Sequence, residues 1–111
     1  SPAVKIFLCA QATDMRRSFD KLAEMTRELL GQDPLSGHLF VFFNKPRDRV
    51  KILFWDRSGY CLYYKRLEEG AFRLPKLDKG GAQLNAAELA LILEGIELAG
   101  SRRQKRFSLS R

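Results

Sequence analysis

The side chains best suited to chemistry are basic, and they are concentrated in two stretches. Of the formal net charge of +7, residues 44–66 contribute +5, from seven Lys or Arg and two Asp. Residues 101–111 contribute another +5, from five basic residues and no acid. Residues 1–43 are balanced, with five of each sign, and residues 67–100 have three basic and six acidic residues, or −3. This asymmetry favours a polyanionic partner such as nucleic acid.

Aromatic residues are interleaved with the first basic stretch, because nine of the twelve lie between Phe40 and Phe72. On a sheet, such a mixture lets cations follow a nucleic-acid backbone while rings stack on bases. We therefore expect a nucleic-acid-binding surface on the sheet and its hairpin. The candidate residues in the folded part are Arg16, Arg17, Lys45, Arg47, Arg49, Lys51, Trp55 and Arg66. In the C-terminal stretch they are Arg102, Arg103, Lys105 and Arg106.

Three structural alternatives compete with this interpretation. Basic side chains on strands can also protect a sheet edge from pairing with another strand, or form a solvated rim. Trp55 and the tyrosines are also suited to packing under a loop or between copies of the chain. Arg16 and Arg17 have Asp14 and Asp20 nearby as ion-pair partners.

Groups for enzymatic or metal chemistry are sparse. The one histidine, His38, follows a turn and opens a strand, so we expect a structural or exposed role rather than a catalytic base. The aspartates stand at caps and turns, where local hydrogen bonding accounts for them. Cys9 and Cys61 lie far apart in apolar surroundings, which favours thiols in a reducing cytoplasm. We expect no enzyme, no metal site and no cofactor.

The expected strand Arg49–Trp55 decides which of these side chains share a face. Alternation places on one face Arg49, Lys51, Leu53 and Trp55, and the opposite face is apolar. A four-residue loop over Asp56–Gly59 would bring to the first face Tyr60, Leu62, Tyr64 and Arg66. A three-residue loop ending in a Gly59 bulge would instead bring Cys61, Tyr63 and Lys65. The sequence leaves both registers open.

The strands that position these residues are marked by apolar and aromatic runs. Val4–Leu8 is a short first strand, and four further runs follow at His38–Phe43, Arg49–Trp55, Tyr60–Leu67 and Ala71–Leu74. Short polar connections containing Gly or Pro predict antiparallel hairpins between the four runs. The longest apolar runs are about five residues, far below the roughly 20 that cross a bilayer.

Two segments have helical periodicity. Ser18 is a suitable N-cap for a helix that ends at Gly31, and Asn85 with Glu88 forms a capping box for a second helix that ends at Gly100. We therefore expect an α+β fold: an antiparallel β-meander of four to five strands with two amphipathic helices packed on one face. Residues 1–100 would form a single domain and residues 101–111 a flexible basic tail.

Several long blocks resemble a known family. They are Ala12–Ala23, Asp33–Phe42, Asp48–Asp56 and Gly59–Glu68, within a likeness that covers Val4–Leu98. The resemblance is to the TnpB, or second-open-reading-frame, accessory protein of the insertion-sequence-sixty-six transposon family. That family is distinct from the RNA-guided nucleases also called TnpB, which are several times longer and need a carboxylate core.

The resemblance implies a bacterial protein encoded beside a larger transposase and needed for efficient transposition, with no established catalytic residues. Combined with the charge pattern, it predicts a non-catalytic, cytoplasmic accessory protein that binds transposon DNA. The alternative is an interaction module that docks on the transposase of the same element without touching DNA. Self-association is a further expectation, and no membrane partner is expected.

Overall fold

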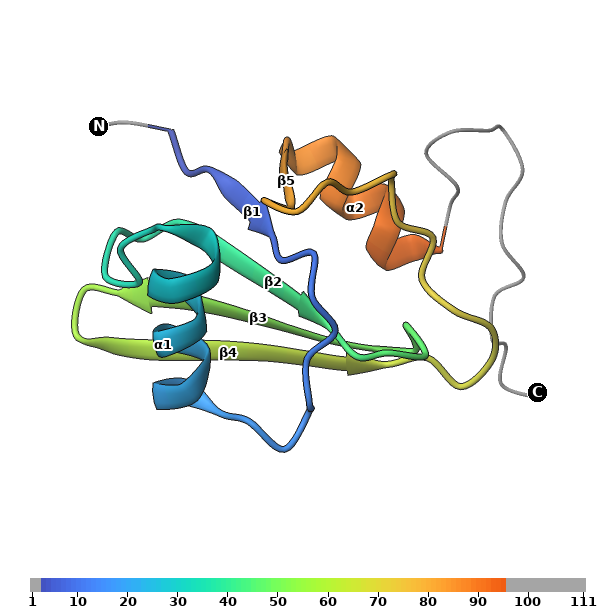
Figure 1. The fold of residues 1–111 in the computed structure, drawn as a ribbon, viewed down its shortest axis with the longest axis horizontal. Coiled ribbons are helices and arrows are strands. Elements are labelled where there is room, and N and C mark those ends of the chain that lie inside the picture. The colour runs from blue at the N-terminus through green and yellow to red at the C-terminus, as the bar shows by residue number, and fades with distance from the viewer. Residues whose placement is uncertain (1–2, 96–111) are drawn as a thin grey trace.

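The computed structural model of the chain describes residues 3–95 (Figure 1). The predicted basic tail lies outside the described residues. Five strands and two helices follow one another along the chain: β1 (Ile6–Leu8), α1 (Phe19–Leu30), β2 (Leu39–Phe43), β3 (Arg49–Asp56), β4 (Gly59–Arg66), β5 (Ala82–Leu84) and α2 (Ala86–Glu94). The predicted α+β class is confirmed.

One sheet holds all five strands, in the order β4-β3-β2-β1-β5. The strands β2, β3 and β4 form the expected antiparallel meander. β1 departs from it, because it pairs parallel to β2 and antiparallel to β5. A parallel pair requires a long crossover, and the segment that carries α1 supplies it.

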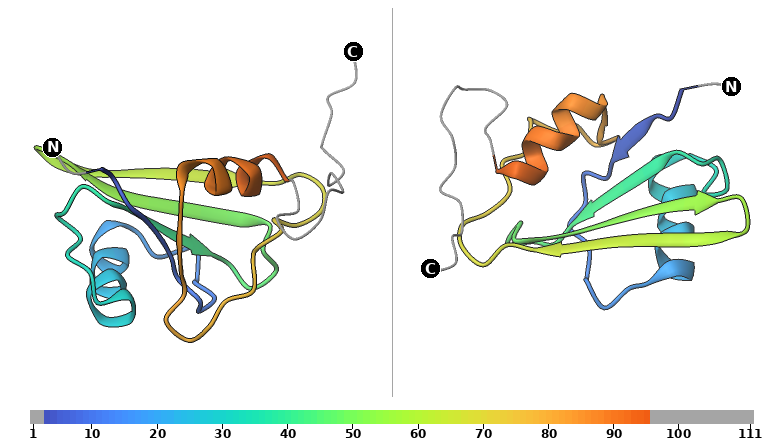
Figure 2. Two further views of the ribbon diagram at one scale, coloured as in Figure 1. Left: turned by 90° about the horizontal axis from the view of Figure 1, so that it is seen from above. Right: turned by 180° about the vertical axis from the view of Figure 1, so that it is seen from behind.

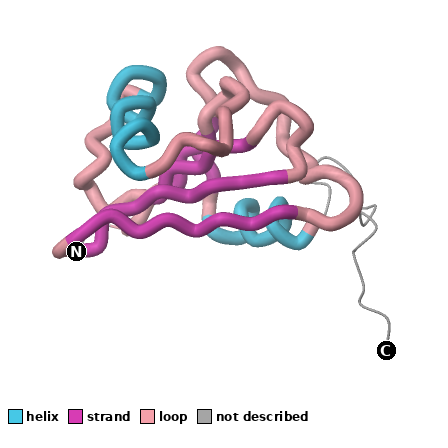
Figure 3. The backbone as a smooth tube through the Cα atoms, turned by 90° about the horizontal axis from the view of Figure 1, so that it is seen from below, coloured by secondary structure: helices cyan, strands magenta, loops and turns pink. Residues whose placement is uncertain are grey.

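The two helices lie on opposite faces of the sheet, so the expectation that both pack on one face is wrong. The left view of Figure 2 and Figure 3 show the sheet between them. Phe40 packs with Leu22 of α1, whereas the next residue, Val41, packs with Ile92 of α2. The physical reason is the apolar run Leu39–Phe43, which presents large side chains to both faces and needs cover on each.

Local chemistry sets the helix ends. α1 begins after Ser18, whose side chain makes no capping bond, and ends at Gly31 with φ 62°. α2 has the predicted capping box, in which the Asn85 side chain accepts from the Glu88 backbone N–H and the Glu88 carboxylate accepts from the Asn85 backbone N–H. Its C-cap is Gly95 with φ 80°. The helix therefore ends earlier than the predicted Gly100, because the first available glycine takes the left-handed conformation.

The expected strand Ala71–Leu74 does not form. Its Phe72 N–H donates to the Arg47 carbonyl at 2.7 Å, and the ring is buried against Phe43, with 5.3 Å between ring centroids. The fifth strand is instead β5, directly after Gly80 and Gly81. Burial of Phe72 thus holds residues 71–74 as a packed loop. The second strand that pairs with β1 is β5, which lies farther along the chain.

Candidate nucleic-acid interface

The β3–β4 hairpin fixes which side chains share a face. Its unbroken ladder pairs Arg49 with Arg66, Lys51 with Tyr64, and Trp55 with Tyr60. This is the pairing expected from a four-residue loop over 56–59, and the alternative with a bulge is wrong. The Ser58 N–H donates to the Asp56 carbonyl, and Asp56 pairs with Gly59, so the turn itself contains two residues.

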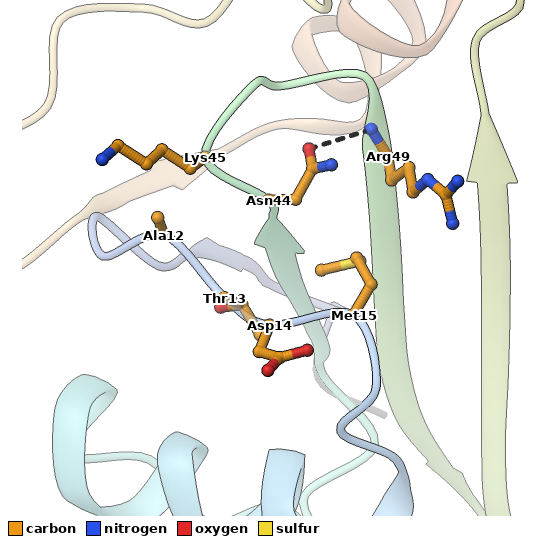
Figure 4. A pocket seen from close by; sticks show the side chains of 7 residues that line it. All are labelled: Ala12, Thr13, Asp14, Met15, Asn44, Lys45 and Arg49. Carbon is orange, nitrogen blue, oxygen red and sulfur yellow. Dashed lines mark hydrogen bonds between the residues drawn. The ribbon is translucent and has the colours of Figure 1, made fainter.

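Four of the predicted cations lie at one end of the sheet, which we call the basic end: Lys45, Arg47, Arg49 and Arg66. An open hollow of about 390 Å³ joins Lys45 and Arg49, which extend outward on either side of Asn44 (Figure 4). A second hollow of about 190 Å³ is lined by Lys45 and Arg47, and a third of about 150 Å³ lies between Arg49, Tyr64 and Arg66. The basic end is therefore one continuous surface.

Asn44 organises the loop that carries two of these cations. Its side-chain Oδ1 accepts from the backbone N–H groups of Asp48 and Arg49, each at 3.0 Å, and its Nδ2 donates to Asp48 Oδ1 at 2.6 Å. The Arg47 N–H donates to the Asn44 carbonyl, and Arg47 adopts φ 60°. The candidate set derived from the sequence missed Asn44, although asparagine between two strands is a recognised turn signal.

Neutralisation differs among the basic side chains. Arg66 pairs with Glu68 at 2.8 Å and Arg16 with Asp14 at 2.6 Å, and all four side chains are substantially exposed. Arg49 donates instead to the Tyr64 hydroxyl at 3.1 Å. The exposed side chains of Lys45 and Arg47 make no hydrogen bond or ion pair within residues 3–95. These two cations and Arg49 are therefore not held by a carboxylate of the described chain.

Arg16 changes the acidity of its neighbour. Its side-chain hydrogen bonds to Asp14, supported by a backbone N–H bond and the positive charge, lower the pKa of that carboxyl from 3.8 to about 2. The folded pKa is the lower one, so the stabilising effect is complete above about 3.8 and is lost as pH falls through about 2.

We expect an NMR titration to place the midpoint of the Asp14 carboxyl at about 2. Arg16→Ala should return it toward 3.8, because it removes the largest cause of the shift. Arg17→Ala is the matched control and should move the midpoint far less, since Arg17 contributes only a weak Coulombic effect. An Asp14 midpoint near 3.8 in the unaltered protein would contradict the described ion pair.

Lys51 is not available to a ligand, which corrects its assignment as a phosphate contact. Its side chain is buried, at 6% exposure, and its Nζ donates to the carbonyls of Met15 and Arg17 at 2.6 and 2.7 Å. The ammonium also lies 4.8 Å from the centroid of the Tyr64 ring. The side chain of Lys51 lies on the predicted face of the sheet, the face of Arg49, but the loop before α1 covers it there.

Arg17 and Trp55 are not brought into the basic end either. Arg17 Nη1 lies 3.6 Å from the sulfur of Met25 on α1, and its side chain lines a separate hollow beside that helix. Trp55 is half-buried and packs edge-on against Tyr60, with 5.2 Å between centroids. It lies six residues along β3 from Arg49, or about 20 Å at the usual strand rise.

The exposed aromatic ring at the basic end is that of Tyr64, whereas Trp55 lies at the other end of β3. Tyr64 is 47% exposed and lies between the two arginines of the β3–β4 ladder. The candidate set missed it, although the register with Trp55 opposite Tyr60 implies it. An exposed ring beside arginines is the arrangement that single-strand binders use for stacking.

The remaining groups considered for chemistry have structural environments. His38 Nδ1 accepts from the Lys5 backbone N–H at 3.0 Å, and both cysteines are free thiols. Burial raises the pKa of the Cys9 thiol. Across residues 3–95, no three His, Cys, Asp or Glu side chains group together as metal ligands would. Neither α1 nor α2 has the length and apolar run needed to span a membrane.

Comparison with known proteins decides the family. The family model described as IS66 Orf2 like protein matches residues 4–103. The chain belongs to this family. Two similar proteins of Sinorhizobium fredii (strain NBRC 101917 / NGR234) are named "Uncharacterized protein y4hO" and "Uncharacterized protein y4jC". The first is 36% identical over 85% of this chain and 82% of its own length, and the second 33% identical over 87% and 83%.

No solved structure matches the chain. Membership of the IS66 Orf2-like family suggests an accessory role in transposition.

Proposed function

We propose that this IS66 Orf2-like protein is a non-catalytic, cytoplasmic accessory factor of transposition that binds the phosphate backbone of transposon DNA through its basic end. One observation carries the proposal. The β2–β3 loop, the start of β3 and the end of β4 bring their cations to the same end of the sheet, with Tyr64 beside Arg49 and Arg66. Backbone phosphates are the polyanion that such a row of cations fits.

The charge balance at this surface supports an anionic ligand. Four cations gather there, and the carboxylates bonded at this end are Asp48, which accepts from Asn44, and Glu68, which pairs with Arg66. The Arg66 pair is exposed, and exposed ion pairs contribute little to stability and exchange readily for another anion. Lys45, Arg47 and Arg49 are the residues that would contact phosphate first.

The test is a titration of labelled transposon-end DNA by fluorescence anisotropy at several salt concentrations. The double variant Arg47→Gln/Arg49→Gln should bind about tenfold to a hundredfold more weakly at low salt. It should also lower the slope of log affinity against log salt by about 2, because two phosphate contacts are lost. Arg57→Gln is the matched control, since this exposed arginine lies in the turn at the other end of β3 and β4.

Three outcomes would contradict the proposal. A loss of log affinity in Arg57→Gln about half that of the double variant would mean that net charge, not the basic end, sets the affinity, because the control removes one charge and the double variant two. An unchanged affinity in the double variant would place binding elsewhere, including the tail with Arg102 and Arg103. No binding at low salt would favour the alternative of a module that docks on the transposase.

A further inference from the structure

β4 forms an unprotected edge of the sheet. It runs for eight residues and pairs with β3 without a bulge, and no other described strand lies on its outer side (Figure 1). It contains no proline, and its charged residues, Lys65 and Arg66, stand at its end. The opposite edge, β5, has only three residues. Long, flat, uncharged edges are the ones that pair with another strand.

The ladder shows which backbone groups of β4 face outward. Beyond the last pair of the ladder, the Leu67 N–H donates to the Asp48 carbonyl at 2.8 Å, so 48 and 67 form a hydrogen-bonded pair. Such pairs alternate along an antiparallel ladder. The N–H and C=O groups that point away from β3 therefore belong to Tyr60, Leu62, Tyr64 and Arg66. Within residues 3–95, these outward groups have no backbone hydrogen-bond partner.

We propose that β4 pairs antiparallel with β4 of a second copy of the chain, in a register centred on Tyr63. The spacing of the outward residues selects this register. A two-fold axis at Tyr63 sets Leu62 opposite Tyr64 of the second copy and Tyr60 opposite Arg66. No other symmetric register pairs all four outward residues with one another. The four outward residues of each copy form four hydrogen-bonded pairs across the interface. These pairs provide about eight backbone hydrogen bonds and continue the sheet through both copies.

The side chains are compatible with this pairing on both faces. Tyr63 is 42% exposed and meets its own symmetry mate in a pair that is not hydrogen-bonded, where side chains approach most closely. On the same face as Tyr63, Lys65 lies opposite Cys61, and on the other face Arg66 lies opposite the ring of Tyr60. No two like charges face each other. A second copy is therefore a better occupant of this edge than a strand of unspecified sequence.

Self-association of the full chain, measured by sedimentation equilibrium without nucleic acid, tests the pairing. The unaltered protein should form dimers. Tyr63→Lys and Tyr63→Glu should each raise the dimer dissociation constant about tenfold or more, because like charges then face each other and a ring pair is lost. An equimolar mixture of the two variants should recover dimers, since lysine then faces glutamate.

The matched controls are Leu91→Lys and Leu91→Glu, at another exposed apolar residue, on α2. They should leave the dissociation constant unchanged. Hydrogen exchange should show the backbone amides of Tyr60, Leu62, Tyr64 and Arg66 protected about tenfold or more in the dimer relative to Tyr63→Glu. A monomeric unaltered protein, a dimer that is insensitive to Tyr63, or a mixture that stays monomeric would overturn the proposal. Because DNA is absent, these outcomes are independent of the DNA-binding proposal.

Discussion

Lys51→Ala should lower the free energy of unfolding by about 2 to 4 kcal/mol, since hydrogen bonds to a charged group contribute about 1.5–3 kcal/mol and the buried stem also packs. The ammonium connects β3 to the segment before α1 by donating to the Met15 and Arg17 carbonyls. Alanine would leave both acceptors without their donor. It would also remove the cation from the Tyr64 ring.

Lys65→Ala is the matched control for this change. Lys65 lies on the opposite face of the sheet and donates to a single carbonyl, that of Leu93 in α2, at 2.8 Å. Its loss should cost about 1.5 kcal/mol, the low end of the range for a bond to a charged group, because Lys65 is only half-buried. Denaturant unfolding monitored by tryptophan fluorescence and circular dichroism measures both variants. Equal effects, or a Lys51→Ala loss below about 0.5 kcal/mol, would show that the two carbonyls find water instead.

The burial of Lys51 shows where reasoning from sequence stops at the candidate site. Strand alternation correctly placed Lys51 on the face of Arg49. A lysine in a strand is ordinarily solvated, so the pattern gave no sign of burial. The loop that covers it lies more than thirty residues earlier in the chain, and alternation carries no information about such distant contacts.

The hairpins and caps could be predicted because their determinants are local. Asn85 and Glu88 stand three residues apart, and their reciprocal bonds form as expected. The meander follows from short connections between aromatic runs. The faces covered by the helices depend instead on which side of β2 each helix meets after its loop. A strand that is apolar on both faces accepts either solution, so the sequence pattern did not decide it.

The basic end was predictable in part for the same reason. Lys45, Arg47 and Arg49 are close in the chain, so one loop and one strand start keep them together. Arg66 joins them only through the β3–β4 register. That register also places Tyr64 beside Arg49, whereas Trp55 lies at the far end of β3 in either register. The two registers that the sequence left open for this hairpin would therefore have brought different β4 side chains to the site.

Gly81→Ala should have the largest effect on stability, a loss of about 3 to 5 kcal/mol, as overpacking against backbone and an unfavourable φ act together. Gly81 has φ 83°, and a Cβ there would overlap the carbonyl oxygen of Leu8. It would also lie 3.2 Å from the Leu8 carbonyl carbon and 3.4 Å from the Ala10 nitrogen. All three atoms belong to backbone, so no side-chain rotation relieves the overlap.

The overlap would force β5 away from β1, because Gly81 directly precedes the ladder in which Ala82 pairs with Leu8. Gly80→Ala provides the control one residue earlier, since a Cβ there would meet only Asp78 Oδ1, at 3.6 Å. It should change the free energy of unfolding by less than about 0.5 kcal/mol. Thermal and denaturant unfolding of the pair measures the difference. Comparable stability of the two variants would mean that β1 and β5 separate without cost, and that β5 contributes little to the core around Leu84.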